Sequence, residues 1–467
     1  MIAIGFMSVA QGILVLALLQ FGYISMLFST IHDSMPWGED QLSLFAVKNR
    51  TDASAVTESS KVGQPFGQET LRSVARGRFP SSGTDDFARS CNWTAKPLHV
   101  PNMECSFIVR PPPESNEGIS WWTAALAMGH AYSLQTGCRL LADYGPGVDV
   151  GHVLQPNAGS GMFPLVDWTT NASEKSFGSF NAKFEDEVLA CRNSKHCYFT
   201  VSDRWNERQL RSIQKVLSQD ERILPIPSYR WAYSGHFHTA SSADVKQLMR
   251  KFPGYTLETG MACSLNRILT LAPTASEYVP NIFSTLIPVL RDDDTLVFSL
   301  YIRTGRTDAM SHLEDKGKPV PNDVERGNNP KLMLRWASNC ALKLEKERLS
   351  AGNFASVVWM IVTDSPLVKQ LAMESFNNIT VTSNETATSA PSIRKVLTTP
   401  TRGLQSKRNR GPSTRDFAEA ILDWFLLGES DAVISHGGVS FGTTGSLRTA
   451  RPQYVTKNSC SKLGWVL

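Results

Sequence analysis

Two arginines near the middle of the chain have the residue type and the spacing to bind an anionic substrate. Arg303 and Arg306 directly follow the apolar run Thr295–Ile302, and a Thr-Gly pair separates them. A guanidinium group offers planar, paired donors that match a phosphate or a pyrophosphate, and the intervening glycine allows the backbone to turn sharply. Either these arginines bind such a group, or they form surface ion pairs with Asp308 or Glu314.

Two aspartates are further candidates. Asp364 follows the apolar run Ser356–Val362, where it either accepts hydrogen bonds from a ribose or a base or, together with Ser365, caps the next helix. Asp423 has apolar neighbours on both sides, so its carboxylate is costly to bury unless it is paired. It therefore contacts a ligand, pairs with a cation such as Arg303, or faces solvent.

A glycine-rich segment precedes the last predicted helix. The segment Ser435–Gly442 reads SHGGVSFG, and it ends in Ser440, Phe441 and Gly442. Backbone N–H groups and a helix dipole at such a turn can hold a phosphate. Because the segment lacks both the GxGxxG and the Walker A spacing, a tight packing turn is the alternative.

Other charged clusters are weaker candidates. The triplet Asp292–Asp294 has carboxylates that can hold a divalent ion, but it precedes its strand, which favours a solvated turn. His236 and His238 lack a third ligand at metal-binding spacing, so we predict no metal site. The stretch Arg394–Arg415 contains seven Lys or Arg residues and no acid. It predicts a mobile loop that either helps to hold an anionic donor or is simply solvated.

Alternating strands and helices must position these candidates. Strands are predicted at 295–302, 356–362 and 432–435, and helices at 330–350, from 366, at 416–427 and after 442. This alternation predicts a parallel sheet, and ligands bind at the carboxyl ends of such strands. Nearer the N-terminus, a helix at 121–135 stops at Gly137 before a strand at 138–143, and helices are also predicted at 242–252 and 278–290.

Length and composition limit the class of protein. The 467 residues are enough for about two to three domains. A hydrophobic content of 42% and a charged content of 19% exclude a disordered chain and a coiled coil. The net charge of +4 is too small to favour nucleic acid as the main partner.

The first residues predict a membrane anchor. Residues 1–31 carry no Asp, Glu, Lys, Arg or His, and this apolar run is long enough to span a bilayer. A signal anchor is favoured over a cleaved signal peptide, whose apolar core is shorter. Acidic residues follow the run, which is compatible with an N-terminus-inside orientation. Residues 32–90 have no sustained apolar period and predict a flexible stem.

Sequons and cysteines predict that the body of the protein lies in the secretory pathway. Asn-x-Ser/Thr sequons occur at Asn49, Asn92, Asn171, Asn378 and Asn384. The eight cysteines all follow the predicted anchor, and their even number permits up to four disulfides. Closeness in sequence suggests the pairs Cys91–Cys105 and Cys191–Cys197.

In this order and spacing, the strand-end motifs resemble the donor half of the fucosyltransferase superfamily, which includes α1,6-, plant-type α1,2- and protein O-fucosyltransferases. Tyr301-Ile302-Arg303 stands at the family's His-x-Arg motif, and Arg306-Thr307-Asp308 resembles its downstream Arg-Thr-Asp. Val357–Pro366 resembles the apolar strand that ends in Thr-Asp-Asp/Ser-Pro. Phe417–Asp431 and Ser440–Gly442 resemble the last block, a helix with an aspartate, a Ser-Asp strand entry and a Ser-Phe-Gly turn.

The resemblance is concentrated in residues 285–450, about a third of the chain. In the amino-terminal half, Gly118–Asp143 is similar to the family's first helix and second strand. However, Gly118-Ile-Ser-Trp-Trp122 replaces the usual Gly-x-Asn-Arg turn.

The resemblance implies a GT-B fold, in which two Rossmann-like domains face each other across a cleft. The acceptor-side domain would span 91–284 and the donor domain 285–467. Such a protein would be an inverting, metal-independent glycosyltransferase without a cofactor, transferring fucose from GDP-fucose to a glycan or glycoprotein. It would be a single-pass type II protein of the Golgi membrane with a lumenal catalytic domain.

The resemblance also implies residue roles. Arg303 would neutralise the β-phosphate of GDP as the glycosidic bond breaks, while Asp364 and Asp423 would contact the guanosine or hold Arg303. Asp308 is the candidate catalytic base, with Glu314 as a second candidate. The implied donor-binding residues are Arg303, Arg306, Asp364, Ser365, Asp423, Ser440, Phe441 and Gly442, the last three through backbone donors.

Two other functions are open. One is a glycosyltransferase for another nucleotide sugar, including a metal-dependent form that would hold its ion through Asp292–Asp294. A non-catalytic carbohydrate-binding or adhesion protein would use the same scaffold, and Tyr301 in place of His and the missing Gly-x-Asn-Arg favour it.

Overall fold

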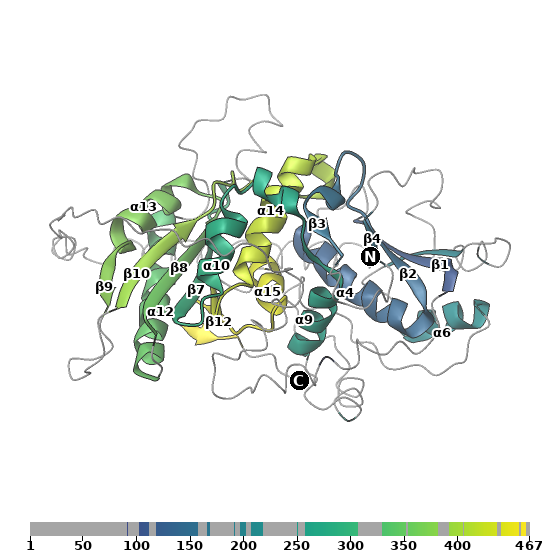
Figure 1. The fold of residues 1–467 in the computed structure, drawn as a ribbon, viewed down its shortest axis with the longest axis horizontal. Helices are drawn as coiled ribbons and strands as arrows, with labels where there is room; N and C mark the ends of the chain where they lie inside the picture. The colour runs from purple at the N-terminus through teal and green to yellow at the C-terminus, as the bar shows by residue number, and fades with distance from the viewer. Residues whose placement is uncertain are drawn as a thin grey trace, which may run out of the picture. The chain divides into compact units, whose positions relative to one another are not determined.

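Two largely parallel β-sheets organise the part of the protein that the computed structural model describes (Figure 1). The described residues are 91, 102–111, 118–156, 166–168, 191, 197–201, 207–217, 250, 257–306, 329–351, 354–381, 392–404, 406–436, 440–456 and 459–463. Helices connect many of the parallel strands, as the predicted mixed α/β fold requires.

The first sheet has the strand order β4-β2-β1-β5, with parallel neighbours. Its strands are β1 (Asn102–Val109), β2 (Cys138–Ala142), β4 (Val166–Trp168) and β5 (Cys197–Thr200). Helix α4 (Ile119–Thr136) connects β1 to β2 and is buried along its whole length, which explains its nearly continuous run of apolar and small residues. Gly137, at φ 80°, ends the helix in the left-handed conformation, as predicted.

The second sheet has the strand order β13-β12-β11-β7-β8-β10-β9. Its strands are β7 (Thr295–Ile302), β8 (Ser356–Thr363), β9 (Ile379–Val381), β10 (Ser392–Thr398), β11 (Ala432–Ser435), β12 (Gln453–Val455) and β13 (Ser461–Lys462). The inner strands are parallel, and only β9 and β13 at the edges are antiparallel to their neighbours. This arrangement confirms the predicted parallel sheet.

The predicted helices around the second sheet are also present. They are α12 (Pro330–Ala351), α13 (Pro366–Phe376), α14 (Thr414–Leu427) and α15 (Ser440–Leu447). Helix α14 begins at Thr414 because Ser413 and Asp416 form a capping box, in which each side chain accepts a hydrogen bond from the other's backbone N–H.

The side chains of β7 alternate between two hydrophobic cores. Phe298 and Leu300 belong to the core that β7 shares with α12 and α13. Val297 and Tyr301 belong to the other core. This core also contains residues of α14, of α15 and of α4, the helix that packs on the first sheet. Helices α14 and α15 therefore lie between the two sheets (Figure 1), and Tyr301 points toward them.

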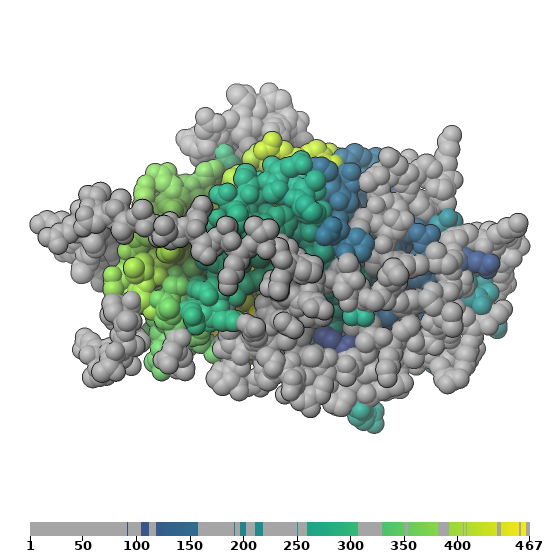
Figure 2. Space-filling view, viewed as in Figure 1, coloured from purple at the N-terminus to yellow at the C-terminus, as the bar shows by residue number. Residues whose placement is uncertain are grey.

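Short elements complete the described chain. They are η4 (Val150–His152), β3 (Leu154–Gln155), α6 (Glu207–Val216), α9 (Leu257–Ile268), β6 (Thr270–Leu271), η6 (Pro273–Glu277), η7 (Ile282–Leu286), α10 (Ile287–Leu290) and η8 (Arg408–Arg410). The segment from η6 to α10 lies at the surface (teal in Figure 2). The prediction of one helix over 278–290 is wrong in detail, because a π-helical turn precedes α10 and Pro288 cannot donate a helical hydrogen bond.

Four disulfides join the cysteines: Cys91–Cys263, Cys105–Cys138, Cys191–Cys197 and Cys340–Cys460. The predicted Cys191–Cys197 bond is confirmed, whereas the predicted Cys91–Cys105 bond is wrong. Strand pairing decides this, because β1 lies beside β2 and brings the Cα atoms of Cys105 and Cys138 to 4.9 Å.

Several predictions concern residues outside the described part of the chain. They are the anchor at 1–31, the stem at 32–90, the sequons at Asn49, Asn92, Asn171 and Asn384, most of the helix at 242–252, His236, His238, Asp308 and Glu314. Within the described residues, none of the helices has the length and hydropathy needed to cross a membrane. The domain division into 91–284 and 285–467 stays a prediction, and its boundary falls within η7.

Candidate functional site

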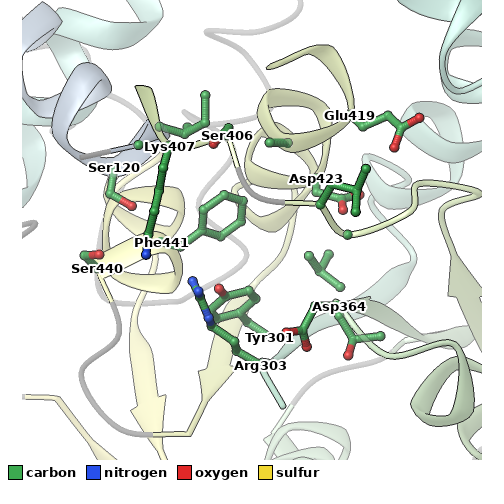
Figure 3. A pocket seen from close by; sticks show the side chains of 17 residues that line it. Ser120, Tyr301, Arg303, Asp364, Ser406, Lys407, Glu419, Asp423, Ser440 and Phe441 are labelled. Atoms are coloured by element: carbon green, nitrogen blue, oxygen red, sulfur yellow. The ribbon is translucent and has the colours of Figure 1, made fainter. Parts of the chain in front are cut away.

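A pocket lies at the carboxyl ends of the inner strands of the second sheet (Figure 3). Tyr301 and Arg303 come from the end of β7, Val362–Asp364 from the end of β8, and Gly403–Lys407, apart from residue 405, from the segment after β10. The walls are completed by Ser440 and Phe441 in α15, by Glu419, Ala420 and Asp423 in α14, and by Gly118–Ser120 at the start of α4. Parallel strands thus bring distant parts of the sequence to one sheet edge, as predicted.

The pocket is smaller than a site for a whole nucleotide sugar. Its cavity volume is about 170 Å³, whereas ligand pockets usually enclose about 300–1,000 Å³. The described lining therefore accommodates part of such a ligand, and the remainder would extend beyond it.

The structure brings most of the predicted site residues into this pocket. Arg303, Asp364, Asp423, Ser440 and Phe441 line it. The remaining donor-binding candidates that are described, Arg306, Ser365 and Gly442, are not among its lining residues.

Arg303 is held at the pocket by the aromatic residue that precedes it in β7. Its guanidinium forms a hydrogen bond with the phenol of Tyr301, and the Tyr301 ring stacks on Phe441 with centroids 5.1 Å apart. Burial raises the pKa of Tyr301 to about 12, so the phenol stays protonated at neutral pH. Gly442 packs behind it, since a Cβ there would lie 3.1 Å from the ring.

Asp364 organises the backbone that carries Arg303. Its carboxylate accepts hydrogen bonds from the backbone N–H of Thr304 at 2.7 Å and of Gly305 at 3.0 Å, and from the Thr304 hydroxyl at 3.1 Å. The helix-capping role falls instead to Ser365, whose hydroxyl accepts a hydrogen bond from the backbone of α13 at 3.3 Å. Asp364 therefore holds the arginine loop, which is one of the two roles that the family resemblance implies.

Asp423 is a buried carboxylate with two hydroxyl partners. It accepts hydrogen bonds from Thr399 and Thr401, each at 2.7 Å. Lys369 donates to the backbone oxygens of the same threonines at 2.8 and 2.7 Å and attracts the carboxylate electrostatically. The predicted cationic partner is thus Lys369 rather than Arg303. Burial raises the pKa of Asp423 from 3.8 to about 6, although these polar neighbours oppose the shift.

This raised pKa predicts a pH-dependent destabilisation. A carboxyl group that binds its proton more tightly when folded lowers the free energy of unfolding as the pH rises from about 4 to about 6. Between these two pH values, the free energy of unfolding of the wild type should fall by up to about 3 kcal/mol relative to that of Asp423→Asn. Urea unfolding at pH 4, 5, 6 and 7 measures the difference. The exposed Asp293→Asn variant is the control, and a wild-type-minus-Asp423→Asn difference that is constant with pH would contradict the prediction.

The charges of the pocket are separated. Asp364, Glu419 and Asp423 lie on one side in Figure 3, whereas Arg303 and Lys407 extend into the pocket on the other, near Ser440. An anionic group is therefore favoured beside the two cations, and hydroxyl or N–H donors are favoured beside the carboxylates. Lys407 belongs to the basic stretch Arg394–Arg415, for which holding an anionic donor was one of the two alternatives, but neither it nor Glu419 was singled out as a site residue.

The prediction of a mobile basic loop at Arg394–Arg415 is wrong. Arg394 lies in β10, is buried, and forms an ion pair with Glu345 at 2.6 Å while stacking over Trp359. Further along, Arg402 pairs with Glu419 at 3.0 Å. Acidic partners on α12 and α14 hold several of its arginines, so the absence of acids within the stretch did not make it mobile.

The acidic triplet Asp292–Asp294 is a turn at the opposite end of β7 from Arg303. All three residues are exposed, and Asp292 accepts a hydrogen bond from the Thr295 hydroxyl at 2.6 Å. This agrees with the favoured interpretation of a solvated turn. In the described ranges, no group of three or more His, Cys, Asp or Glu side chains is arranged to hold a metal ion.

Comparisons with known proteins give a remote likeness in structure. No protein-family model and no curated protein matches the sequence. Among solved structures, the NodZ α-1,6-fucosyltransferase co-crystallised with GDP has 12% identity and a TM-score of 0.39, with 78% of this chain and 98% of that chain covered. NodZ has also been solved from Bradyrhizobium.

Two further solved structures are similar. An Arabidopsis thaliana FUT1 variant in complex with GDP has 11% identity and a TM-score of 0.39, covering 85% of this chain and 81% of that chain. POFUT1 in complex with GDP-fucose has 10% identity and a TM-score of 0.23, covering 78% of this chain and 97% of that chain. The chain is similar to fucosyltransferases. Because these TM-scores are below 0.5, the residues of the pocket, and not this likeness, support the function proposed below.

Proposed function

We propose that this protein is an inverting glycosyltransferase that transfers fucose from GDP-fucose to a glycan or glycoprotein. The observation that carries the proposal is the placement of Arg303. It lies at the carboxyl end of the central strand β7, extends into the pocket, and is held there by Tyr301 and by the loop that Asp364 organises. A guanidinium fixed in this way suits the diphosphate of a nucleotide sugar.

The proposed chemistry uses Arg303 as the charge-stabilising group. The acceptor hydroxyl attacks the anomeric carbon of fucose, the bond from that carbon to the β-phosphate oxygen breaks, and the electron pair leaves with GDP. Arg303 stabilises the charge that develops on this phosphate. Ser440 at the start of α15 lies on the same side of the pocket, where helix N–H groups favour an anion.

The carboxylate side of the pocket suits the rest of the donor. Asp423 and Glu419 offer acceptors for the N–H groups of a guanine base or for sugar hydroxyls. Asp308 remains the proposed base that takes the acceptor proton, with Glu314 as the second candidate; both lie outside the described residues. Phosphate neutralisation by arginine supports a reaction that does not need a metal, because the alternative carboxylates Asp292–Asp294 lie at the opposite sheet edge.

We further propose a GT-B arrangement and a lumenal location. The two largely parallel sheets support paired Rossmann-like domains. Four disulfides are typical of an oxidising compartment, and the sequon residue Asn378 is exposed in a left-handed turn. A Golgi membrane location through residues 1–31 is the corresponding proposal.

Thermal unfolding of the purified full-length protein tests the donor. We expect GDP and GDP-fucose to raise the midpoint equally with and without EDTA, since a ligand at about 100 times its Kd adds about 2.7 kcal/mol to the folded state. Stabilisation by UDP-sugars only with a divalent ion would favour the metal-dependent alternative. If no nucleotide binds, the non-catalytic carbohydrate-binding alternative takes precedence.

A further inference from the structure

Lys407 places a second cation in the pocket. Its side chain extends from the loop after β10 and its amino group points into the pocket, as does the guanidinium of Arg303 (Figure 3). The two residues come from different strand ends, β10 and β7. A diphosphate carries more than one negative charge, so a single arginine leaves part of that charge uncompensated.

The start of the loop that carries Lys407 is fixed by helices α13 and α14, which pack on the second sheet. It is bound through Thr399 and Thr401 to Asp423 and Lys369. Gly403, at φ 67°, packs so closely against the backbone that a Cβ would lie 2.6 Å from the Asp364 Cα. The loop is therefore held against the same aspartate that organises the Arg303 loop.

The end of the loop is fixed by a residue that follows β2 of the first sheet. The Tyr144 hydroxyl donates a hydrogen bond of 2.5 Å to the backbone oxygen of Ser406, the residue before Lys407. Tyr144 is fully buried and packs on Phe417 of α14, with ring centroids 4.7 Å apart, and on Trp122 of α4 at 5.8 Å. This aromatic cluster joins the two sheets at the residue that precedes the lysine.

Among the described residues, the part of the pocket wall at the start of α4, which adjoins the loop, contains no cation. Gly118, Ile119 and Ser120 line the pocket at the start of α4, and a Cβ on Gly118 would lie 3.4 Å from the Ser406 hydroxyl. Lys407 thus supplies positive charge where α4 approaches the pocket.

We propose that Lys407 binds the diphosphate of the nucleotide-sugar donor together with Arg303, and that Tyr144 is the positioning residue that holds Lys407 in place. This inference rests on the proposed function, since it names how the same site holds its donor. It makes the contact between the two sheets part of the donor site. The position of a phosphate-binding cation then depends on the hydroxyl of Tyr144, a residue that follows β2 of the first sheet.

Isothermal titration of the full-length protein with GDP, guanosine and inorganic pyrophosphate tests the inference. We expect Lys407→Met to weaken GDP and pyrophosphate binding about 10- to 100-fold and to leave guanosine binding unchanged. Lys407→Arg should restore most of the GDP affinity. The exposed Lys343→Met variant on α12 is the matched control and should bind all three ligands as the wild type does.

A double-mutant cycle separates positioning from a general structural role. We expect Tyr144→Phe to weaken GDP binding about 3- to 10-fold when Lys407 is present and to have almost no effect in the Lys407→Met background. Equal effects of Tyr144→Phe in both backgrounds would overturn the positioning role. A thermal midpoint near that of the wild type verifies that each variant is folded.

The remaining outcomes distinguish the two proposals. If the wild type binds GDP and Lys407→Met binds it equally well, the inference is wrong and the proposed function stands. If Lys407→Met weakens guanosine and GDP alike, Lys407 does not act on the phosphates and the inference is also wrong. If the folded wild type does not bind GDP, both proposals fail.

Discussion

Arg303→Ala is expected to lower kcat for GDP release from GDP-fucose by about 10³-fold. Arg303 extends into the pocket at the end of β7 and is aligned by the Tyr301 phenol and by the loop that Asp364 holds. Its removal leaves the developing phosphate charge without its fixed guanidinium. Because Arg303 is only half-buried, the fold should be retained.

Release of GDP with water as the acceptor measures this effect without a known acceptor. Arg303→Lys should retain part of the activity, since it keeps the positive charge but loses the planar pair of donors. Arg348→Ala is the matched control, because Arg348 lies in the last turn of α12, which leads to the start of β8 at the opposite sheet edge. An Arg303→Ala rate within about tenfold of the wild type would remove the proposed role.

Glu429→Gln is expected to lower the free energy of unfolding by about 3–5 kcal/mol. Glu429 is buried between α14 and β11 and pairs with Arg291 at 2.7 Å and with Arg448 at 2.6 Å. Arg448 is also buried and stacks over Phe425 at 3.8 Å. Neutralising the glutamate would leave the buried guanidinium of Arg448 without its compensating charge.

The same group predicts acid sensitivity. Burial alone would raise the pKa of Glu429, but the attraction of Arg291 and Arg448 lowers it from 4.5 to about 2. A lowered pKa stabilises the folded state above about pH 4.5, and this contribution is lost as the pH falls toward 2. The difference in the free energy of unfolding between the wild type and Glu429→Gln should therefore become smaller in acid.

Urea unfolding at pH 7 and pH 3 measures both effects. Glu374→Gln serves as the control, because Glu374 is exposed on α13, where its carboxylate accepts a hydrogen bond from Gln370 at 2.8 Å. Glu374→Gln should change the free energy of unfolding by no more than about 0.5 kcal/mol. If Glu429→Gln changes stability no more than this control, the buried ion pairs contribute nothing net to the fold.

The central part of the second sheet could be predicted from local sequence. Strands buried on both faces need continuous apolar runs, and β7 and β8 are such runs, bounded by an acidic turn before β7 and by polar residues after each strand. The rule that ligands bind at the carboxyl ends of parallel strands then predicts that Arg303, Asp364 and Ser440 lie together.

Strand β10 could not be predicted in the same way. Its Ile393 is 49% exposed while Arg394 is 4% exposed, the reverse of the usual hydrophobic pattern. The reversal is possible because Glu345, on α12, supplies the charge that the buried arginine needs. Local patterns carry no information about a partner that is nearly fifty residues away.

The sequence by itself therefore determined the α/β class, the order of the main strands and helices, the resemblance to fucosyltransferases and the sheet edge where the site lies. Only the tertiary structure decided the disulfide pairs beyond Cys191–Cys197, the partners of Asp423 and the entry of Lys407 into the pocket. The physical reason is the sequence separation of the residues that make the contacts. Periodicity and strand ends are set by neighbours in the chain. Lys407, in contrast, is positioned through Tyr144, which follows β2 of the first sheet, and this contact exists only after both halves have packed.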